Sequence, residues 1–364
     1  RSVYSFSKLL AALARYDPSE EVTVVLDEHV KRGIALAFRS FAKPRGARVL
    51  KRVELGNESV ISNWSGSAGL TAYGQSKRQA FSHGVSVAKD ILTGAKAPEP
   101  CLAFARTQKA GKTRLVWGYP LSMTLIEGIV GYPLIQEFKA LDTPMAFAER
   151  KSVTGAKILS STVQNAFWYG LDASSFDATI QRVFIDVAFS ILRTWFDGAD
   201  KYTQHVLSVV QNYFTFTPIV IPRPGHPGET SLVVGKRFGV PSGSYFTQLV
   251  DSIVNTIVLG ALSSRFGFRL NFRDFMVLGD DSVFFTDTHL DLSVISEYVQ
   301  TTFGIRINPE KSKHGRTGED VPFLGVKWRK GIPYRDPREA LAKMLYPERF
   351  RKYNNVQREA ILVV

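Results

Sequence analysis

The sequence predicts an α+β protein, because it contains both β-type runs and apolar stripes of helical period. Three segments show these patterns. A β-prone run at 167–171 leads into apolar residues at helical spacing from Ile180 to Leu192. Two β-type runs meet at a tight turn around 279–281, and the apolar stripe at 246–258 predicts a long helix. The chain has 364 residues, more than one compact core usually holds, so we expect two or three packed subdomains.

Charge is the first indication of function. Lys and Arg number 46 against 33 Asp and Glu, which leaves a net charge of +13. Such an excess favours a polyanionic partner, with nucleic acid ahead of acidic membranes, although a merely soluble basic protein is the alternative. Cys101 is the sole cysteine, which excludes a disulfide framework and a cysteine-rich zinc cluster. No apolar run approaches the roughly 18 residues of a membrane span.

Two β-like runs, 102–106 and 114–118, flank a turn with Ala and Gly and predict a hairpin. Three cations, Lys109, Lys112 and Arg114, cluster at this hairpin. The sequence therefore predicts a concentration of positive charge at its tip.

Two further segments have the composition of loops. The basic stretch 43–52 contains Pro and Gly, and a phosphate-contacting surface and a solvated loop are equally good interpretations of it. Later, Pro218, Pro222, Pro224 and Pro227 interrupt the chain between two apolar runs. They predict an extended excursion from the main body.

The first candidate catalytic residues follow the run at 167–171. Asp172 comes at the end of a predicted strand, and Asp177 comes near the start of a predicted helix. For Asp177 alone, a helix cap is the favoured interpretation. Asp172 has no such simple structural explanation.

The second candidate is the turn Gly279-Asp280-Asp281, which joins the two β-type runs of 274–285. Adjacent carboxylates repel, so a site that keeps both ionised needs a cation, and a hard ion such as Mg²⁺ fits best. The tripeptide alone is a weak signal, because Asp-rich turns are ordinary. Together with Asp172, however, it predicts a site that holds two metal ions for phosphoryl transfer.

The third candidate is a loop of small residues, 239–247, that leads into the predicted long helix. Thr247, Asp251 and Asn255 are spaced i, i+4 and i+8, so they share one face of this helix, where they can meet a sugar edge. A polar face toward solvent is an equally good interpretation of the helix by itself.

At these residues the chain resembles viral RNA-dependent RNA polymerases, and most closely those of partitiviruses and picobirnaviruses, which are small double-stranded RNA viruses. The resemblance rests on motifs in a fixed order along residues 100–345. They are the basic fingertip motif at 109–114, the first palm motif at 172–177, the second at Ser242-Gly243 with Thr247 and Asn255, and the third at 279–281. Two weaker motifs follow: the fourth is a helix at 292–303 ending at Gly304 and then 308–311, and the fifth is a β-like segment at 323–328 with a turn at 331–333.

The resemblance implies a right-hand fold of fingers, palm and thumb, with an antiparallel palm sheet backed by helices. The expected division is fingers at 1–165, including the hairpin 102–118, palm at 166–195, a fingers insertion at 196–236, palm at 237–335, and the start of an incomplete thumb at 336–364.

The resemblance also assigns roles to residues. Asp172 and Asp280 ligate two Mg²⁺ ions, for which Mn²⁺ can substitute, and Asp281 assists them. Lys311 is the candidate general acid, with a solvated lysine as the alternative. The triphosphate is bound by Lys109, Lys112 and Arg114. The ribose 2′-hydroxyl is read by Asp177 with Ser242, Gly243, Thr247 and Asn255.

One departure from the family pattern leaves a choice open. Many relatives carry Asn one helical turn after the Thr, where this chain has Asp251. Either Asn255 takes the role of that amide, or Asp251 contacts Asp177 as a protonated or water-bridged partner.

The implied function is RNA-templated RNA synthesis from NTPs during viral replication and transcription, inside the virion or in the host cytoplasm. Template and product RNA, NTPs and a viral capsid protein are the expected partners, and no membrane is expected. Two alternatives are a reverse transcriptase and an inactive RNA-binding or capsid-internal structural protein. Asp177 and the Ser242-Gly243 loop disfavour the first, and the intact metal carboxylates disfavour the second.

Overall fold

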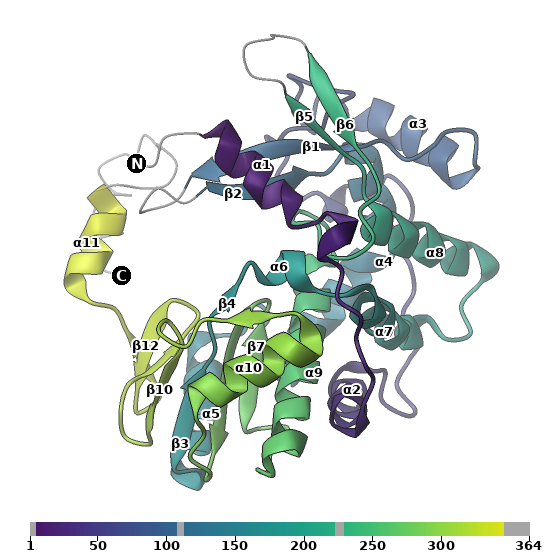
Figure 1. Ribbon diagram of the computed structural model, residues 1–364. Coiled ribbons are helices and arrows are strands. Elements are labelled where there is room, and N and C mark those ends of the chain that lie inside the picture. Colours follow the sequence, from purple (N-terminus) through teal and green to yellow (C-terminus); the bar gives the residue numbers. More distant parts are fainter. Residues whose placement is uncertain (1–4, 108–112, 223–228, 346–364) are drawn as a thin grey trace, which may run out of the picture.

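The computed structural model describes residues 5–107, 113–222 and 229–345, in which helices surround four small sheets (Figure 1). This arrangement confirms the α+β class. The helices are α1 (Phe6–Ala14), α2 (Glu28–Phe41), α3 (Phe81–Leu92), α4 (Leu121–Ala140), α5 (Lys151–Gln164), α6 (Phe176–Thr179), α7 (Arg182–Arg193), α8 (Lys201–Phe216), α9 (Thr247–Phe266), α10 (Leu292–Phe303) and α11 (Pro337–Leu345).

The sheet that carries the candidate carboxylates is antiparallel throughout, with the order β10-β3-β8-β7. Its strands are β3 (Phe167–Gly170), β7 (Phe275–Leu278), β8 (Asp281–Thr286) and β10 (Lys313–Arg316). Consecutive residues of β8 are buried, because both faces of the sheet are covered. Phe284 joins the main core, and Phe285 joins a second cluster with Ile158 of α5 and Trp328.

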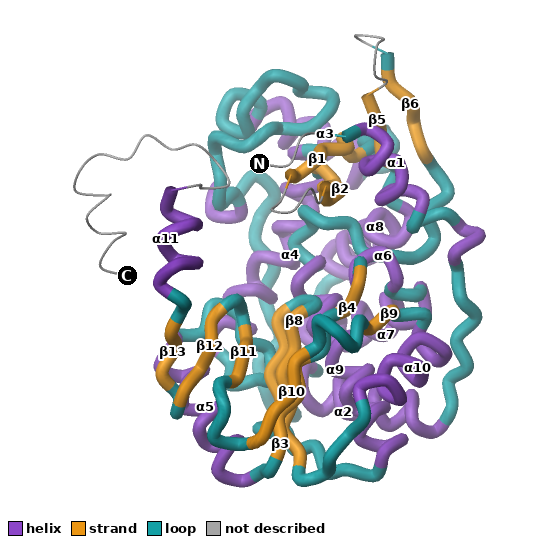
Figure 2. Tube along the Cα trace, turned by 60° about the vertical axis from the view of Figure 1, so that its left-hand side comes forward, coloured by secondary structure: helices purple, strands orange, loops and turns teal. Residues whose placement is uncertain are grey.

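Helix α9 runs through the middle of the molecule beside this sheet and contacts β7 and α2 (Figure 2). Gly33 of α2 lets the two helices meet, since a Cβ there would lie 2.2 Å from the carbonyl oxygen of Ile257. The expectation that no segment is apolar enough for a membrane span was wrong for this helix, whose length and mean hydropathy of 1.3 pass that test. Its best window is 78% buried in the structure, as in a core helix.

A second four-stranded sheet, in the order β2-β1-β5-β6, lies at the top of Figure 1. It comprises β1 (Cys101–Thr107), β2 (Thr113–Gly118), β5 (Ile219–Pro222) and β6 (Thr230–Val233). β1 and β2 form the predicted hairpin, with Arg106 opposite Arg114. The proline-interrupted segment pairs with it, because β5 is parallel to β1. The basic stretch 43–52 is a loop, as predicted.

The remaining strands form two small sheets. They are β4 (Ala173–Ser174) with β9 (Arg306–Ile307), and β11 (Val321–Phe323) with β12 (Val326–Arg329) and β13 (Ile332–Tyr334). The single β-type segment expected at 323–328 was wrong, because Leu324 and Gly325 have φ of 54° and 70° and reverse the chain there. The turn expected at 331–333 lies at Lys330-Gly331 instead, and strand β13 follows it.

Candidate active site

Asp172 lies just beyond the end of β3, with an exposed side chain and a firmly held backbone. Its N–H donates to Ser312 Oγ at 3.0 Å, and its carbonyl oxygen accepts from the N–H of Asn308 at 2.8 Å. Both partners belong to the loop that carries Lys311. The two hydrogen bonds therefore fix the backbone of Asp172 relative to the loop that carries Lys311.

The Gly279-Asp280 turn joins β7 to β8, as predicted, and Leu278 pairs with Asp281 across it. Gly279 has φ of 66°, a conformation that glycine adopts without the penalty that a Cβ imposes. Asp280 and Asp281 are both exposed at the tip. The turn therefore presents two adjacent carboxylates to solvent on a short, fully paired hairpin.

The pKa of Asp281 is raised to about 6. Partial desolvation of the carboxylate by neighbouring atoms is the largest cause, followed by the charge of Asp280, and the charge of Asp172 acts in the same direction. The backbone N–H of Leu324, in the turn between β11 and β12, donates to this carboxylate and opposes the shift. The three carboxylates are thus electrostatic neighbours.

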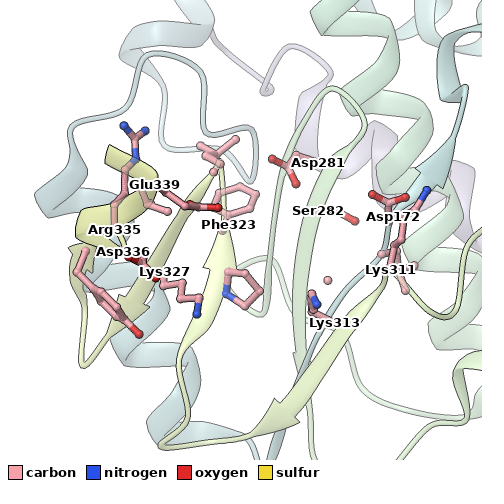
Figure 3. A pocket seen from close by; sticks show the side chains of 17 residues that line it. Asp172, Asp281, Ser282, Lys311, Lys313, Phe323, Lys327, Arg335, Asp336 and Glu339 are labelled. Carbon is pink, nitrogen blue, oxygen red and sulfur yellow. The ribbon is translucent and has the colours of Figure 1, made fainter. Parts of the chain in front are cut away.

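Asp172 and Asp281 line the same cavity, of about 410 Å³, from the adjacent strands β3 and β8 (Figure 3). Lys311 lies beside Asp172 in this view, and Lys327 and Arg335 line the opposite side. The cavity therefore brings carboxylates and several cations together. Such a site suits a ligand that carries both bound cations and phosphates.

The donor chemistry of Asp172, Asp280 and Asp281 fits a hard divalent cation, because carboxylate oxygens are its preferred ligands and a cation relieves their mutual repulsion. Within the three described ranges, no group of three or more His, Cys, Asp or Glu side chains already has the spacing of a closed metal site. The three carboxylates are therefore neighbours with suitable chemistry and not a preassembled ligand cage.

Asp251, which is buried, and Asp177, which is half-buried, form an acid pair next to this turn. Burial, and then the charge of Asp280, raises the pKa of Asp177 to about 6, while the charge of Arg114 and a hydrogen bond from Asp251 lower it. Burial raises the pKa of Asp251 well above its usual range, and the charges of Asp177 and Asp280 add to this. Burial thus favours the protonated form of Asp251, which donates a hydrogen bond to Asp177.

This pair answers the question that the sequence left open, since it is Asp251 that contacts Asp177. Asp251 and Asn255 are only 3% and 5% exposed, so the solvent-face interpretation of this helix was wrong. Asp177 also does not cap a helix by its side chain. It lies in the first turn of α6, whose N-cap is Ser175.

The small-residue loop before α9 is held in place by three of its own predicted site residues. Ser242 Oγ accepts from the N–H of Trp117 at 3.1 Å, and Thr247 Oγ1 donates to the carbonyl oxygen of Pro241 at 2.8 Å. Gly243 has φ of 101°, and a Cβ there would lie 2.6 Å from the carbonyl oxygen of Trp117. In this structure these residues shape the loop beside the acid pair.

Asn255 contacts the Gly279-Asp280 turn and not Asp177. Its Nδ2 donates to the carbonyl oxygen of Gly279 at 3.1 Å. From one turn earlier on α9, Ser252 Oγ accepts from the N–H of Gly279 at 2.9 Å. Ser252 was not singled out in the sequence, because a serine inside an apolar helix carries no distinctive signal.

Arg114 lies on β2, and its charge reaches Asp177, which places it at the edge of the same site. Lys109 and Lys112, predicted to bind triphosphate with it, lie outside the described residues. Lys311 is exposed and lines the cavity, as its predicted role requires.

Two further residues near the site were missed. Glu127 of α4 is fully buried and accepts hydrogen bonds from the hydroxyl of Ser244 and the N–H of Tyr245. A lone carboxylate in an apolar helix was the available signal for it. Tyr16 is buried, donates to the carbonyl oxygen of Val240, and feels the charges of Asp177 and Asp251. Nothing local in the sequence connects it to residues so distant along the chain.

Solved structures establish the fold class first. The RNA-dependent RNA polymerase of a human picobirnavirus, in a form lacking its insertion loop, superposes with a TM-score of 0.77 over 99% of this chain and 72% of that chain. The sequence identity is 17%, so this likeness concerns the fold. It confirms the right-hand α+β polymerase architecture.

A family model described as viral RNA-dependent RNA polymerase matches residues 14–349, and the chain belongs to this family. The RNA-directed RNA polymerase of Cryptosporidium parvum virus 1 is 33% identical over 249 residues, which cover 65% of this chain and 45% of that protein. The corresponding protein of Atkinsonella hypoxylon virus is 36% identical over 121 residues, 30% of this chain and 18% of that protein. The chain thus spans less than half the length of these relatives.

Proposed function

We propose that this chain is the catalytic core of an RNA-directed RNA polymerase, which adds nucleotides from NTPs to an RNA 3′ end opposite an RNA template. One observation carries the proposal. Asp172 and Asp281 face a common cavity from adjacent strands, and a protonated acid pair lies within electrostatic reach of Asp280. Metal binding and ribose recognition would therefore occupy neighbouring sites.

Asp172 and Asp280, assisted by Asp281, would hold two Mg²⁺ or Mn²⁺ ions. When bound, such ions acidify the attacking 3′-hydroxyl and neutralise charge on the leaving pyrophosphate. Arg114 would bind the triphosphate, and Lys311 would give its proton to the pyrophosphate oxygen that leaves. Lys109 and Lys112 are proposed to assist Arg114.

The acid pair supplies a physical basis for choosing NTP over dNTP. Asp177, ionised above a pKa of about 6, would accept a hydrogen bond from the ribose 2′-hydroxyl, while the proton on Asp251 keeps its carboxylate oriented. A deoxynucleotide leaves this buried acceptor without its partner, which costs about 1–3 kcal/mol. The loop of Ser242, Gly243 and Thr247 would form the wall beside the sugar.

The proposed domain division follows from these roles. Residues 1–165 and 196–236 would form the fingers, 166–195 and 237–335 the palm, and 336–364 the beginning of the thumb. Template and product RNA would contact the basic surfaces, and a viral capsid protein is a further proposed partner. The proposed place of action is the virion interior or the host cytoplasm.

A primer-extension assay with purified protein, Mg²⁺, template RNA and labelled NTPs tests the proposal. Wild-type protein should extend the primer, and Asp280→Ala should lower the rate by at least 10³-fold, in line with the loss of a catalytic metal ligand. Lys89→Gln, a charge change at an exposed position of α3 outside the basic loop, serves as the control and should remain active. Undiminished RNA synthesis by Asp280→Ala would contradict the assignment of Asp280 as a catalytic metal ligand.

Two measurements separate the rival functions. A reverse transcriptase would incorporate dNTPs at least as well as NTPs, whereas the acid pair predicts a strong preference for NTPs. An inactive structural protein would bind RNA without metal, whereas a true metal site predicts that Mn²⁺ raises the melting temperature of the wild type and not of Asp280→Ala.

A further inference from the structure

Gly279 is contacted by α9 on three sides. Its N–H donates to Ser252 Oγ at 2.9 Å, and its carbonyl oxygen accepts from Asn255 Nδ2 at 3.1 Å. On the third side, a Cβ would lie 2.8 Å from Nε2 of Gln248. Both backbone polar groups of this one residue are therefore hydrogen-bonded to side chains of a single helix.

The side chains of Ser252 and Asn255 are both buried and hydrogen-bonded. Ser252 is fully buried, Asn255 is 5% exposed, and Gly279 is buried between them. Ser252 Oγ donates its own proton to the carbonyl oxygen of Gln248, which leaves its lone pairs for Gly279. Side chains held in this way transmit the position of α9 directly to the residue that precedes Asp280.

These contacts with α9 matter because the turn carries two adjacent carboxylates that repel each other. Without a bound cation, this repulsion opposes a closed turn. Metal sites need their ligands within about 0.5 Å of the productive geometry, and this depends on the groups that hold the ligands.

We propose that Ser252 and Asn255 are positioning residues, which preset the Gly279 backbone so that Asp280 binds metal ions, and that Asn255 takes no part in reading the ribose. The inference rests on the proposed function for the identity of the metal site. It reassigns Asn255 from the sugar to the turn and adds Ser252 to the machinery. Residues of α9 then have two roles: Asp251 bonds to Asp177, and Ser252 and Asn255 position Gly279.

The test titrates Mn²⁺ into the full chain without RNA or NTP and follows the heat of binding. Asn255→Ala and Ser252→Ala should each weaken Mn²⁺ binding about fivefold to tenfold, the effect of one lost buried hydrogen bond. Thr256→Val is the matched control. It removes a buried hydroxyl of the same helix that bonds to the carbonyl oxygen of Ser252 and not to Gly279.

A second measurement separates positioning from sugar reading. In primer extension, Asn255→Ala should lower kcat about tenfold while the ratio of NTP to dNTP efficiency stays within about twofold of wild type. Unchanged Mn²⁺ affinity in both variants, or a lost NTP preference in Asn255→Ala, would overturn the inference. A wild-type chain that binds Mn²⁺ but makes no RNA would overturn the proposed function instead, and the Mn²⁺ titration would still decide the role of the two residues.

Discussion

The carboxyl group of Asp251 on α9 donates a hydrogen bond to the carboxylate of Asp177 on α6, so two acids share one proton in the interior. Desolvation and the nearby charge of Asp280 raise the pKa of both groups and favour a state in which the pair holds one proton. One oxygen of Asp251, Oδ1, is buried without a hydrogen-bond partner.

Asp251→Asn is expected to keep most of the activity, because an amide donates to Asp177 as the protonated carboxyl does. The wild type should lose activity at high pH, when Asp251 ionises and repels Asp177, whereas the variant has no such proton to lose. Both proteins should lose activity below about pH 6, where Asp177 becomes protonated. Profiles of kcat/KM against pH measure both limbs.

Asp251→Ala provides the contrast, since it removes the donor altogether. It should reduce the preference for NTP over dNTP by about tenfold, the effect of a misoriented hydrogen-bond acceptor. If Asp251→Asn were as impaired as Asp251→Ala at neutral pH, the shared proton would not be the feature that matters.

Arg114→Gln should weaken NTP binding and also shift a pKa. Removing the cation should raise the KM for NTP about tenfold, because one charge-assisted contact to the triphosphate is lost. The same charge lowers the pKa of Asp177, so its removal should raise that pKa further, and the acid limb of the pH profile should move to higher pH. Lys89→Gln, at an exposed position of α3 outside the basic loop, should change neither quantity.

Glu127→Gln should make the stability of the protein less dependent on pH. Burial raises the pKa of Glu127 from its usual 4.5 to about 8, so the folded state retains a proton that the unfolded state loses. Its contribution to stability is complete below pH 4.5 and is lost as pH rises toward 8, by a few kcal/mol. Gln imitates the protonated form and should lack this decline.

Denaturant unfolding between pH 5 and 8.5 compares the two proteins. Glu127→Ala is the second variant, and it should be less stable than wild type by about 2 kcal/mol at pH 5, because Ser244 and the N–H of Tyr245 lose their acceptor. Parallel pH dependences for wild type and Glu127→Gln would show that this carboxyl titrates normally.

The strands and helices that present the carboxylates were predictable because they depend on local patterns. The run before Asp172, the 279–281 turn and the helix 292–303 ending at Gly304 appear where their hydrophobic period and turn residues place them. Local chemistry failed at 323–328, where a β-type composition conceals a reversal at Leu324, a residue that rarely adopts positive φ.

The partners of the site residues were not predictable, because side-chain contacts across the fold depend on how elements pack. Helical spacing put Asp251 and Asn255 on one face, yet Asp251 meets Asp177 and Asn255 meets Gly279. The spacing is equal, but the two residues lie beside different neighbours along α9. Tyr16 reaches the same site from the turn that follows α1, and no pattern in the sequence predicts this contact.

Gly279→Ala separates backbone strain from loss of catalysis. Alanine at φ of 66° costs about 1 kcal/mol, and its Cβ meets only the flexible end of Gln248, so adding Gln248→Ala should restore little. Gly267→Ala is the matched control, since its φ is 70° and its Cβ meets nothing within 4 Å. Both variants should lose similar stability in denaturant unfolding. Only Gly279→Ala should also reduce the rate of primer extension, by about tenfold or more, because only its strain displaces Asp280. Equal activity of the two variants would contradict this prediction.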